Sequence, residues 1–300
     1  MITQGESELD INIDKEKDFK DFVVNNRLVL FFIFTLLYTW AFWIPMVLIR
    51  YGIIKIQVPL IIGQSLGAIG PLVALIILSK ASGGVVSLDK ILDKIRLTKD
   101  RQEIFWLILA SLTLPLFTIF GNLLNYIFGE ESQFYIIQPA KWEQLGLWLV
   151  LIIPITFFPS LLTSPFFEEP GWRGFAVEEL QSKFGRHIGS LIIGSYWWLW
   201  HQPINIAAGA AVTIYSYFLM IAHSFIIDSL YNLSNRNLLS AMLAHASLII
   251  NFTYIYAGTQ LYFWDGNLFV ILSFIFLIIV LRVIEAKREK QQKNEVLEQN

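Results

Sequence analysis

The chain has 300 residues, of which 55% are hydrophobic and only 15% charged, and its mean hydropathy is +0.57. Soluble domains carry about 25% charged residues, so the composition excludes an ordinary soluble protein and predicts a polytopic membrane protein. A net charge of -2, with basic residues spread through loops, argues against a nucleic-acid partner. The absence of cysteine excludes a thiol nucleophile, an iron–sulfur cluster and a disulfide framework.

Eight apolar stretches approach the ~20 residues that a helix needs to cross a bilayer. They run from Leu28 to Ile49, Val58 to Ser79, Ile104 to Phe128, Leu145 to Val177, His187 to Ala207, Ala211 to Leu230, Leu238 to Tyr256 and Asn267 to Ile284. We therefore predict an all-α transmembrane bundle of about eight spans. The fourth stretch contains four prolines, which remove backbone donors and kink helices, so we expect it to be broken or strongly kinked.

Basic residues are distributed unevenly between the flanks of these stretches. With the N-terminus inside, only Arg50, Lys55 and Lys141 of the 22 Lys and Arg residues fall on the outer side, as the positive-inside rule requires. Both termini are therefore expected in the cytoplasm, and the chain in the cell membrane as a multi-pass protein. We expect residues 1–27 and 285–300 to be charged, partly disordered tails around a membrane domain at 28–284, whose functional core spans about 145–256.

Charged side chains interrupt the fourth apolar stretch at Glu168, Glu169 and Arg173. Ionisable groups at membrane depth are costly and indicate a functional site with a partner. Two histidines on later spans, His201 and His245, are candidate partners. At 1.5 Å per helical residue, Glu168, His201 and His245 lie about 15, 21 and 13 Å from the nearest expected cytoplasmic flank. These side chains therefore share one slab of the membrane.

A carboxylate and two imidazoles at one depth are consistent with two kinds of chemistry. Glu168 can act as a general base on a water while the imidazoles donate hydrogen bonds to a developing oxyanion. Alternatively, the three side chains hold a catalytic zinc with an open water position, although no HExxH signature is present. No cofactor is certain, and a divalent metal, zinc, remains the alternative.

Glu169 and Arg173 stand four residues apart, the spacing at which opposite charges pair along a helix. We expect Arg173 to neutralise Glu169 and to leave Glu168 on a different face. Because Pro170 disfavours helical geometry at the residue before it, a helix cap at Glu169 is the alternative.

These residues resemble the CAAX protease and bacteriocin-processing (CPBP, or ABI) family of intramembrane proteases, to which type II CAAX prenyl endopeptidases belong. Its first motif, Glu-Glu-x-x-x-Arg, is matched by Glu168, Glu169 and Arg173. Its second, an aromatic residue and then histidine after three positions, is matched by Trp197 and His201. The surrounding Glu-Glu-Pro-Gly-Trp-Arg-Gly-Phe and Trp-His-Gln-Pro segments look like the bacterial branch.

The third family motif, histidine and then Asn or Asp after three positions, is matched only in part. His245 supplies the histidine, but Ile249 occupies the last position. Asn251 lies six residues after His245, about 240° around a helix, and reaches the same cavity only if the span is distorted. Asn205, four residues after His201, is a second candidate substitute.

The resemblance implies a helical core with a site open to the cytoplasm and a glutamate-activated water that hydrolyses a peptide bond. It implies Glu168 as the base, His201 and His245 as oxyanion or water-orienting groups, and Asn251 as an assistant. The expected partners are membrane lipids and a peptide or membrane-protein substrate, and the expected roles are CAAX-type proteolysis, bacteriocin immunity or peptide processing.

Two other functions are compatible with parts of the sequence. A noncatalytic immunity or membrane partner protein of the same fold is favoured by the incomplete third motif. A transporter would need inverted repeats with a broken span in each half, and only one proline-broken span is present.

Several polar residues in the spans have simpler interpretations than catalysis. His201 beside three tryptophans can belong to an interfacial aromatic belt, and His245 among small residues can be a helix-packing side chain. His223 is expected to be a satisfied packing histidine, and Asp228 a solvated charge at the membrane boundary.

Overall fold

The structure, a computed structural model, describes residues 17–129, 133–210, 212–255 and 268–298. Its helices are α2 (Arg27–Arg50), α3 (Leu60–Ala68), α4 (Gly70–Ala81), α5 (Leu88–Leu92), α6 (Arg101–Phe128), α7 (Pro139–Leu145), η1 (Gly146–Trp148), α8 (Leu149–Ser160), α9 (Ser164–Gly171), η2 (Trp172–Val177), α10 (Glu178–Ala208), α11 (Ile214–Leu233), α12 (Leu238–Tyr254) and α13 (Leu268–Glu298). The expected N-terminal tail up to residue 16, and the expected span ends at Ala211, Tyr256 and Asn267, lie outside the described residues.

Six helical segments in the described part of the chain are long and apolar enough to cross a membrane. They are Arg27–Arg50, Leu60–Ala81, Arg101–Phe128, Pro139–Ser160, Ile214–Leu233 and Leu268–Glu295. The two remaining expected spans are also helical, but α12 has only 17 residues and α10 is less apolar. The chain is thus an all-α, multi-pass membrane protein, and the count of eight spans stays a prediction.

The fourth expected span is broken, as its prolines predict. It forms η1, α8, α9 and η2, with a turn at residues 161–163 between α8 and α9. Two prolines lie in α8 and two in α9, and the last of them, Pro170, precedes the π-helix η2. Since proline cannot donate the next helical hydrogen bond, Pro170 favours the change of helical register there. Short π-segments occur frequently at functional sites.

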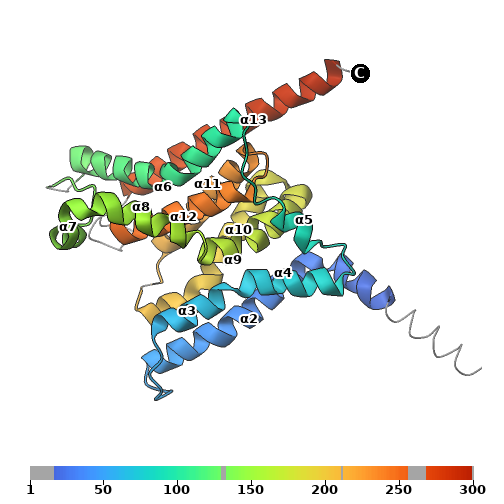
Figure 1. The fold of residues 1–300 in the computed structure, drawn as a ribbon, viewed down its shortest axis with the longest axis horizontal. Coiled ribbons are helices and arrows are strands. Elements are labelled where there is room, and N and C mark those ends of the chain that lie inside the picture. The colour runs from blue at the N-terminus through green and yellow to red at the C-terminus, as the bar shows by residue number, and fades with distance from the viewer. Residues whose placement is uncertain (1–16, 130–132, 211, 256–267, 299–300) are drawn as a thin grey trace, which may run out of the picture.

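Within the broken segment, α9 lies in the middle of the bundle, whereas α8 is largely exposed. In Figure 1, α6 and α13 run along one side and α2 with α4 along the other, with α9 and α12 between them. Helix α10, which has 31 residues like α13, packs against both α2 and α11. It bends at Gly185, whose φ of 78° and ψ of 168° lie in a region that only glycine readily adopts. The expected fifth span starts at His187, just after this bend.

Charged flanks from distant parts of the chain meet at one end of the bundle. Arg27 at the start of α2 pairs with Glu179 at 2.9 Å, and Lys94 after α5 pairs with Glu178 at 2.7 Å. Both glutamates lie in the first turn of α10, whereas Arg50 reaches the carbonyl of Ala207 near its other end. The structure therefore places these expected cytoplasmic flanks on the same side, and which side faces the cytoplasm stays a prediction.

The expected C-terminal tail is helical, as part of α13, up to Glu298, and the domain boundary at residue 285 stays a prediction. Glu285 is only 3% exposed and binds Arg282 at 2.8 Å and Asn232 at 3.2 Å. These buried polar contacts stabilise the helix at the start of the charged segment, because the buried Arg282 and Glu285 are paired with each other.

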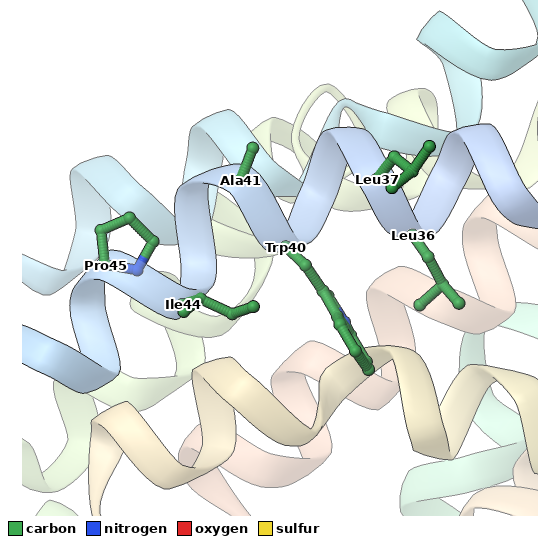
Figure 2. Close-up of a pocket in the computed structure, with 6 residues that line it drawn as sticks. All are labelled: Leu36, Leu37, Trp40, Ala41, Ile44 and Pro45. Atoms are coloured by element: carbon green, nitrogen blue, oxygen red, sulfur yellow. The ribbon is translucent and has the colours of Figure 1, made fainter.

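The outer faces of the spans are apolar. One groove of about 520 Å³ follows α2 and is lined by Leu36, Leu37, Trp40, Ala41, Ile44 and Pro45 (Figure 2). Trp40 points from α2 toward α10 and donates its indole N–H to the carbonyl oxygen of Trp200 at 3.1 Å. An apolar outer surface on membrane-spanning helices is suited to contact with lipid chains.

Candidate active site

Two adjacent carboxylates on α9 point into different surroundings. The Glu168 side chain is 2% exposed, and its Oε2 accepts hydrogen bonds from the indole N–H groups of Trp172 at 3.3 Å and Trp197 at 3.1 Å. Consecutive helical residues project about 100° apart, so the neighbouring Glu169 faces another part of the bundle. The separation of the two carboxylates expected from the sequence is confirmed.

Glu169 is part of a buried ion pair with Arg173. The Arg173 Nη1 donates to both carboxylate oxygens, at 3.0 and 3.1 Å, and neither side chain is more than 1% exposed. Pro170 lies inside α9, so the two residues meet by helical spacing and the alternative of a cap at Glu169 is wrong. Glu169 Oε1 also lies 2.7 Å from His245 Nδ1, which links α9 to α12.

His201 lies beside the same tryptophan that binds Glu168. Its Nδ1 is 2.9 Å from the carbonyl oxygen of Trp197, one turn earlier on α10. The rings of His201 and His245 lie 5.6 and 5.3 Å from the Trp197 ring, on α10 and α12. Because Trp197 and Trp200 are 2% and 0% exposed, the interpretation as an interfacial belt is wrong.

The hydrogen bonds of both histidines define which ring nitrogen can act. A carbonyl or carboxylate oxygen accepts, so Nδ1 carries the proton in His201 and in His245. In the described part of the chain neither Nε2 makes a hydrogen bond with another protein group. A carboxylate that orients one imidazole nitrogen leaves the other free for chemistry, as in Ser-His-Asp catalytic triads.

Close packing holds α9 at this position. A Cβ added to Gly171 would lie 2.8 Å from Cβ of Pro71 on α4 and 3.0 Å from the ring of Phe31 on α2. Real Cβ atoms do not approach other atoms this closely, so glycine at position 171 lets α9 sit directly on α2 and α4. The contact fixes the glutamate pair relative to these two helices.

The asparagine candidates make no hydrogen bond with this cluster among the described residues. Helix α12 is regular through Asn251, so the distortion that would turn Asn251 toward the His245 face is absent. Asn251 is buried, and its Oδ1 has no hydrogen-bond partner among the described residues. Asn205 is half-buried one turn beyond His201, with no hydrogen bond from its side chain in the part of α10 described.

Two site residues are missed by the sequence interpretation, Asp228 and Trp172. Asp228 on α11 is 0% exposed and accepts a hydrogen bond from Arg173 Nε at 3.0 Å, so the expectation of a solvated boundary charge is wrong. Arg173 thus has two carboxylate partners. The signal in the sequence is a lone acid in the apolar run from Ile226 to Leu230, because a buried charge needs a partner.

His223 is buried on α11, as expected for a packing residue, and its ring contacts Phe252 and Phe274. Neither ring nitrogen has a hydrogen-bond partner among the described residues. The expectation that this histidine would be satisfied is therefore wrong.

The described side chains do not form a zinc site of the expected kind. No group of three His, Asp or Glu residues within the described ranges is arranged to hold one metal ion. A catalytic zinc needs three protein ligands, whereas Glu168 is bound by two indoles and Glu169 by Arg173 and His245. The residues present therefore do not fit a zinc bound by Glu168, His201 and His245.

Comparison with known proteins agrees with this arrangement. Residues 146–253, which include all of the clustered side chains on α9, α10 and α12, match the family model described as Rce1-like, type II CAAX prenyl endopeptidase. Over these residues the chain is similar to the CAAX protease family. A relative, CAAX prenyl protease 2 of Methanococcus maripaludis, is 42% identical over 52 residues, which cover 17% of this chain and 18% of that protein. The expected bacterial branch of the family stays a prediction.

Proposed function

We propose that the chain is an intramembrane endopeptidase of the CAAX protease family in which Glu168 activates a water. The supporting observation is the unequal environment of the two adjacent carboxylates. Arg173 and His245 bind Glu169, whereas the hydrogen bonds to Glu168 come from two neutral indole N–H groups. Two neighbouring carboxylates in such different surroundings have different acid–base roles. Glu168 is the one that can take a proton from water.

In the proposed reaction, Glu168 removes a proton from the water while the water oxygen attacks the carbonyl carbon of the scissile peptide bond. In this proposal His245 acts as the imidazolium: its Nδ1–H is held by the Glu169 carboxylate and its Nε2–H donates to the oxyanion, while the unprotonated Nε2 of His201 accepts a hydrogen bond from the water and orients it. Protonated Glu168 then transfers the proton to the leaving amine as the C–N bond breaks. Glu169 and Arg173 hold His245 in place, and Asn251 has no part in the proposed reaction.

The test is cleavage of quenched fluorescent peptides by purified protein in liposomes. The name of the relative makes prenylated CAAX peptides the first substrates to try, beside an unmodified library. Glu168→Gln keeps the shape of the side chain and is expected to lower the cleavage rate about 10²- to 10⁴-fold. Glu103→Gln is the control, because Glu103 is also a buried, ion-paired carboxylate, but at the charged end of the bundle. Equal rates in wild type and Glu168→Gln would contradict the proposal.

A chelator distinguishes this chemistry from a metal-dependent one. Since the described side chains do not provide a three-ligand site, we expect cleavage to persist after treatment with a strong chelator. Loss of activity that added zinc restores would instead assign the water activation to a metal.

A noncatalytic immunity protein of the same fold is the second candidate. It is favoured by Ile249 in place of the third-motif asparagine and by the regular helix that keeps Asn251 away from His245. Protection of cells from a toxic peptide by Glu168→Gln as effectively as by wild type, without cleavage by either protein, would favour this candidate.

A further inference from the structure

Asp228 is a fully buried carboxylate to which the proposed reaction gives no role. It lies on α11, outside the three family motifs, and is 0% exposed. Burial of a carboxylate is expensive unless it is paired and hydrogen-bonded. Its Oδ1 accepts a hydrogen bond from Arg173 Nε at 3.0 Å, which connects it directly to the active-site cluster.

All three nitrogens of the Arg173 guanidinium contact other side chains. Its Nε binds Asp228, its Nη1 binds both oxygens of Glu169, and its Nη2 lies 3.4 Å from the Ser224 hydroxyl oxygen. The guanidinium carbon lies 5.0 Å from the centre of the Trp197 ring. Because the guanidinium N–H groups are fixed in one plane, contacts at Nε and Nη1 together determine its orientation. Without Asp228, the Nε contact that prevents rotation is lost.

Asp228 also lies close to a second buried polar group, formed by Ser190 and Arg282. Its Oδ2 accepts no hydrogen bond among the described residues. Arg282 Nη2 donates to Ser190 Oγ at 2.7 Å, and Arg282 Nη1 donates to Glu285 at 2.8 Å. These residues belong to α10 and α13, so Asp228 lies near polar groups of both helices as well as near Arg173.

We propose that Asp228 is a positioning residue: it orients Arg173, which in turn fixes Glu169 and the ring of His245. The chain of contacts from Asp228 through Arg173 and Glu169 to His245 has distances of 3.0, 3.0 and 2.7 Å. The expected effect of Asp228 on the cleavage rate rests on the proposed hydrolytic function. The expected effect of Asp228 on the orientation of Arg173 and His245 does not.

The kinetic test uses Asp228→Asn, which keeps the shape of the side chain and removes its charge. We expect kcat to fall at least about tenfold while KM stays within about twofold, because the substrate-binding surface is unchanged. Glu103→Gln is the matched control for loss of a buried, ion-paired carboxylate and is expected to leave kcat near the wild-type value. An unchanged kcat in Asp228→Asn, or an equal loss in the control, would overturn the proposal.

A double variant tests whether Asp228 acts through Arg173. Arg173→Lys keeps the positive charge, but an ammonium group cannot reproduce the hydrogen bonds that the planar guanidinium makes to both carboxylates. If Asp228 acts only by orienting Arg173, the double variant Asp228→Asn/Arg173→Lys should have the same kcat as the single variant with the lower kcat. Losses that multiply would show two independent roles and reject the inference.

A measurement without substrate separates this inference from the proposed function. In protein labelled with ¹⁵N-arginine and ¹⁵N-histidine, we expect the Nε–H of Arg173 and the Nδ1–H of His245 to exchange slowly with solvent. Both should exchange at least about tenfold faster in Asp228→Asn, whether or not any peptide is cleaved. Should this variant not fold, Asp228→Glu, which keeps the charge but changes the position of the carboxylate relative to Arg173 Nε, gives the same test. Unchanged exchange in the folded variant would disprove the positioning role.

Discussion

At the scale of single residues, the surroundings of a carboxylate decide what it can do. Glu168 and Glu169 are chemically identical neighbours, yet one is bound by indole N–H groups and the other by a guanidinium and an imidazole. Trp197 is central to this difference, because its indole binds Glu168 and its ring lies between the two histidines and beneath Arg173. Trp197, the aromatic residue of the second motif, therefore contacts the proposed base directly.

Trp197→Phe tests this role, since it removes the N–H donor and keeps an aromatic ring. A hydrogen bond to a charged group contributes about 1.5–3 kcal/mol, so we expect the cleavage rate to fall about ten- to hundredfold. Trp198→Phe is the matched control, because the Trp198 indole donates to Ser216 Oγ at 3.1 Å, away from the glutamates. A similar loss in both variants would mean that the effect is on packing and not on Glu168.

At the scale of secondary structure, the segment from α9 to η2 changes from an α-helix to a π-helix. Pro170 and Gly171 lie between the glutamate pair and Arg173. The first lacks a backbone donor, and the second allows direct contact with α2 and α4. The same short segment thus provides the i, i+4 ion pair and the close approach that positions it.

Gly171→Ala is expected to lower the free energy of unfolding by about 1–3 kcal/mol, because the new methyl group overlaps Pro71 and Phe31. The measurement is thermal unfolding in detergent, together with the cleavage rate of the folded fraction, which should also fall as α9 moves. Gly185→Ala is the matched control, because it introduces the same methyl group into open space, at a backbone conformation that favours glycine. We expect it to lower the free energy of unfolding by about 1–3 kcal/mol. The cleavage rate of the folded protein should stay unchanged. Wild-type stability of Gly171→Ala would argue against the tight packing of α9.

At the scale of the whole molecule, the charged ends of the helices define an orientation in the membrane. The cysteine-free chain allows single cysteines to report it. Lys55, after α2, and Lys90, in α5, are both exposed and lie in flanks expected on opposite sides. In intact cells we expect a membrane-impermeant maleimide to label Lys55→Cys, and to label Lys90→Cys only after lysis. The reverse pattern would place the charged end of the bundle, where Arg27 and Lys94 pair with the first turn of α10, outside the cell.

Much of the architecture could be predicted from the sequence because it depends on local or bulk properties. The apolar composition, the helical spans, the break caused by the prolines and the pairing of Glu169 with Arg173 each depend on residues close together in the chain. Helical period and the cost of burying charge act over one or two turns. The family resemblance was recognised from the same short motifs.

The tertiary structure alone decided which side chains share the site. The contacts of Glu168 with Trp197, Arg173 with Asp228 and Glu169 with His245 join residues 29, 55 and 76 positions apart. Depth in the membrane can be estimated from the sequence, but lateral neighbours depend on how helices pack and rotate against one another. For that reason Asp228 moved from an expected boundary charge to the centre of the bundle, and the regular α12 left Asn251 away from His245.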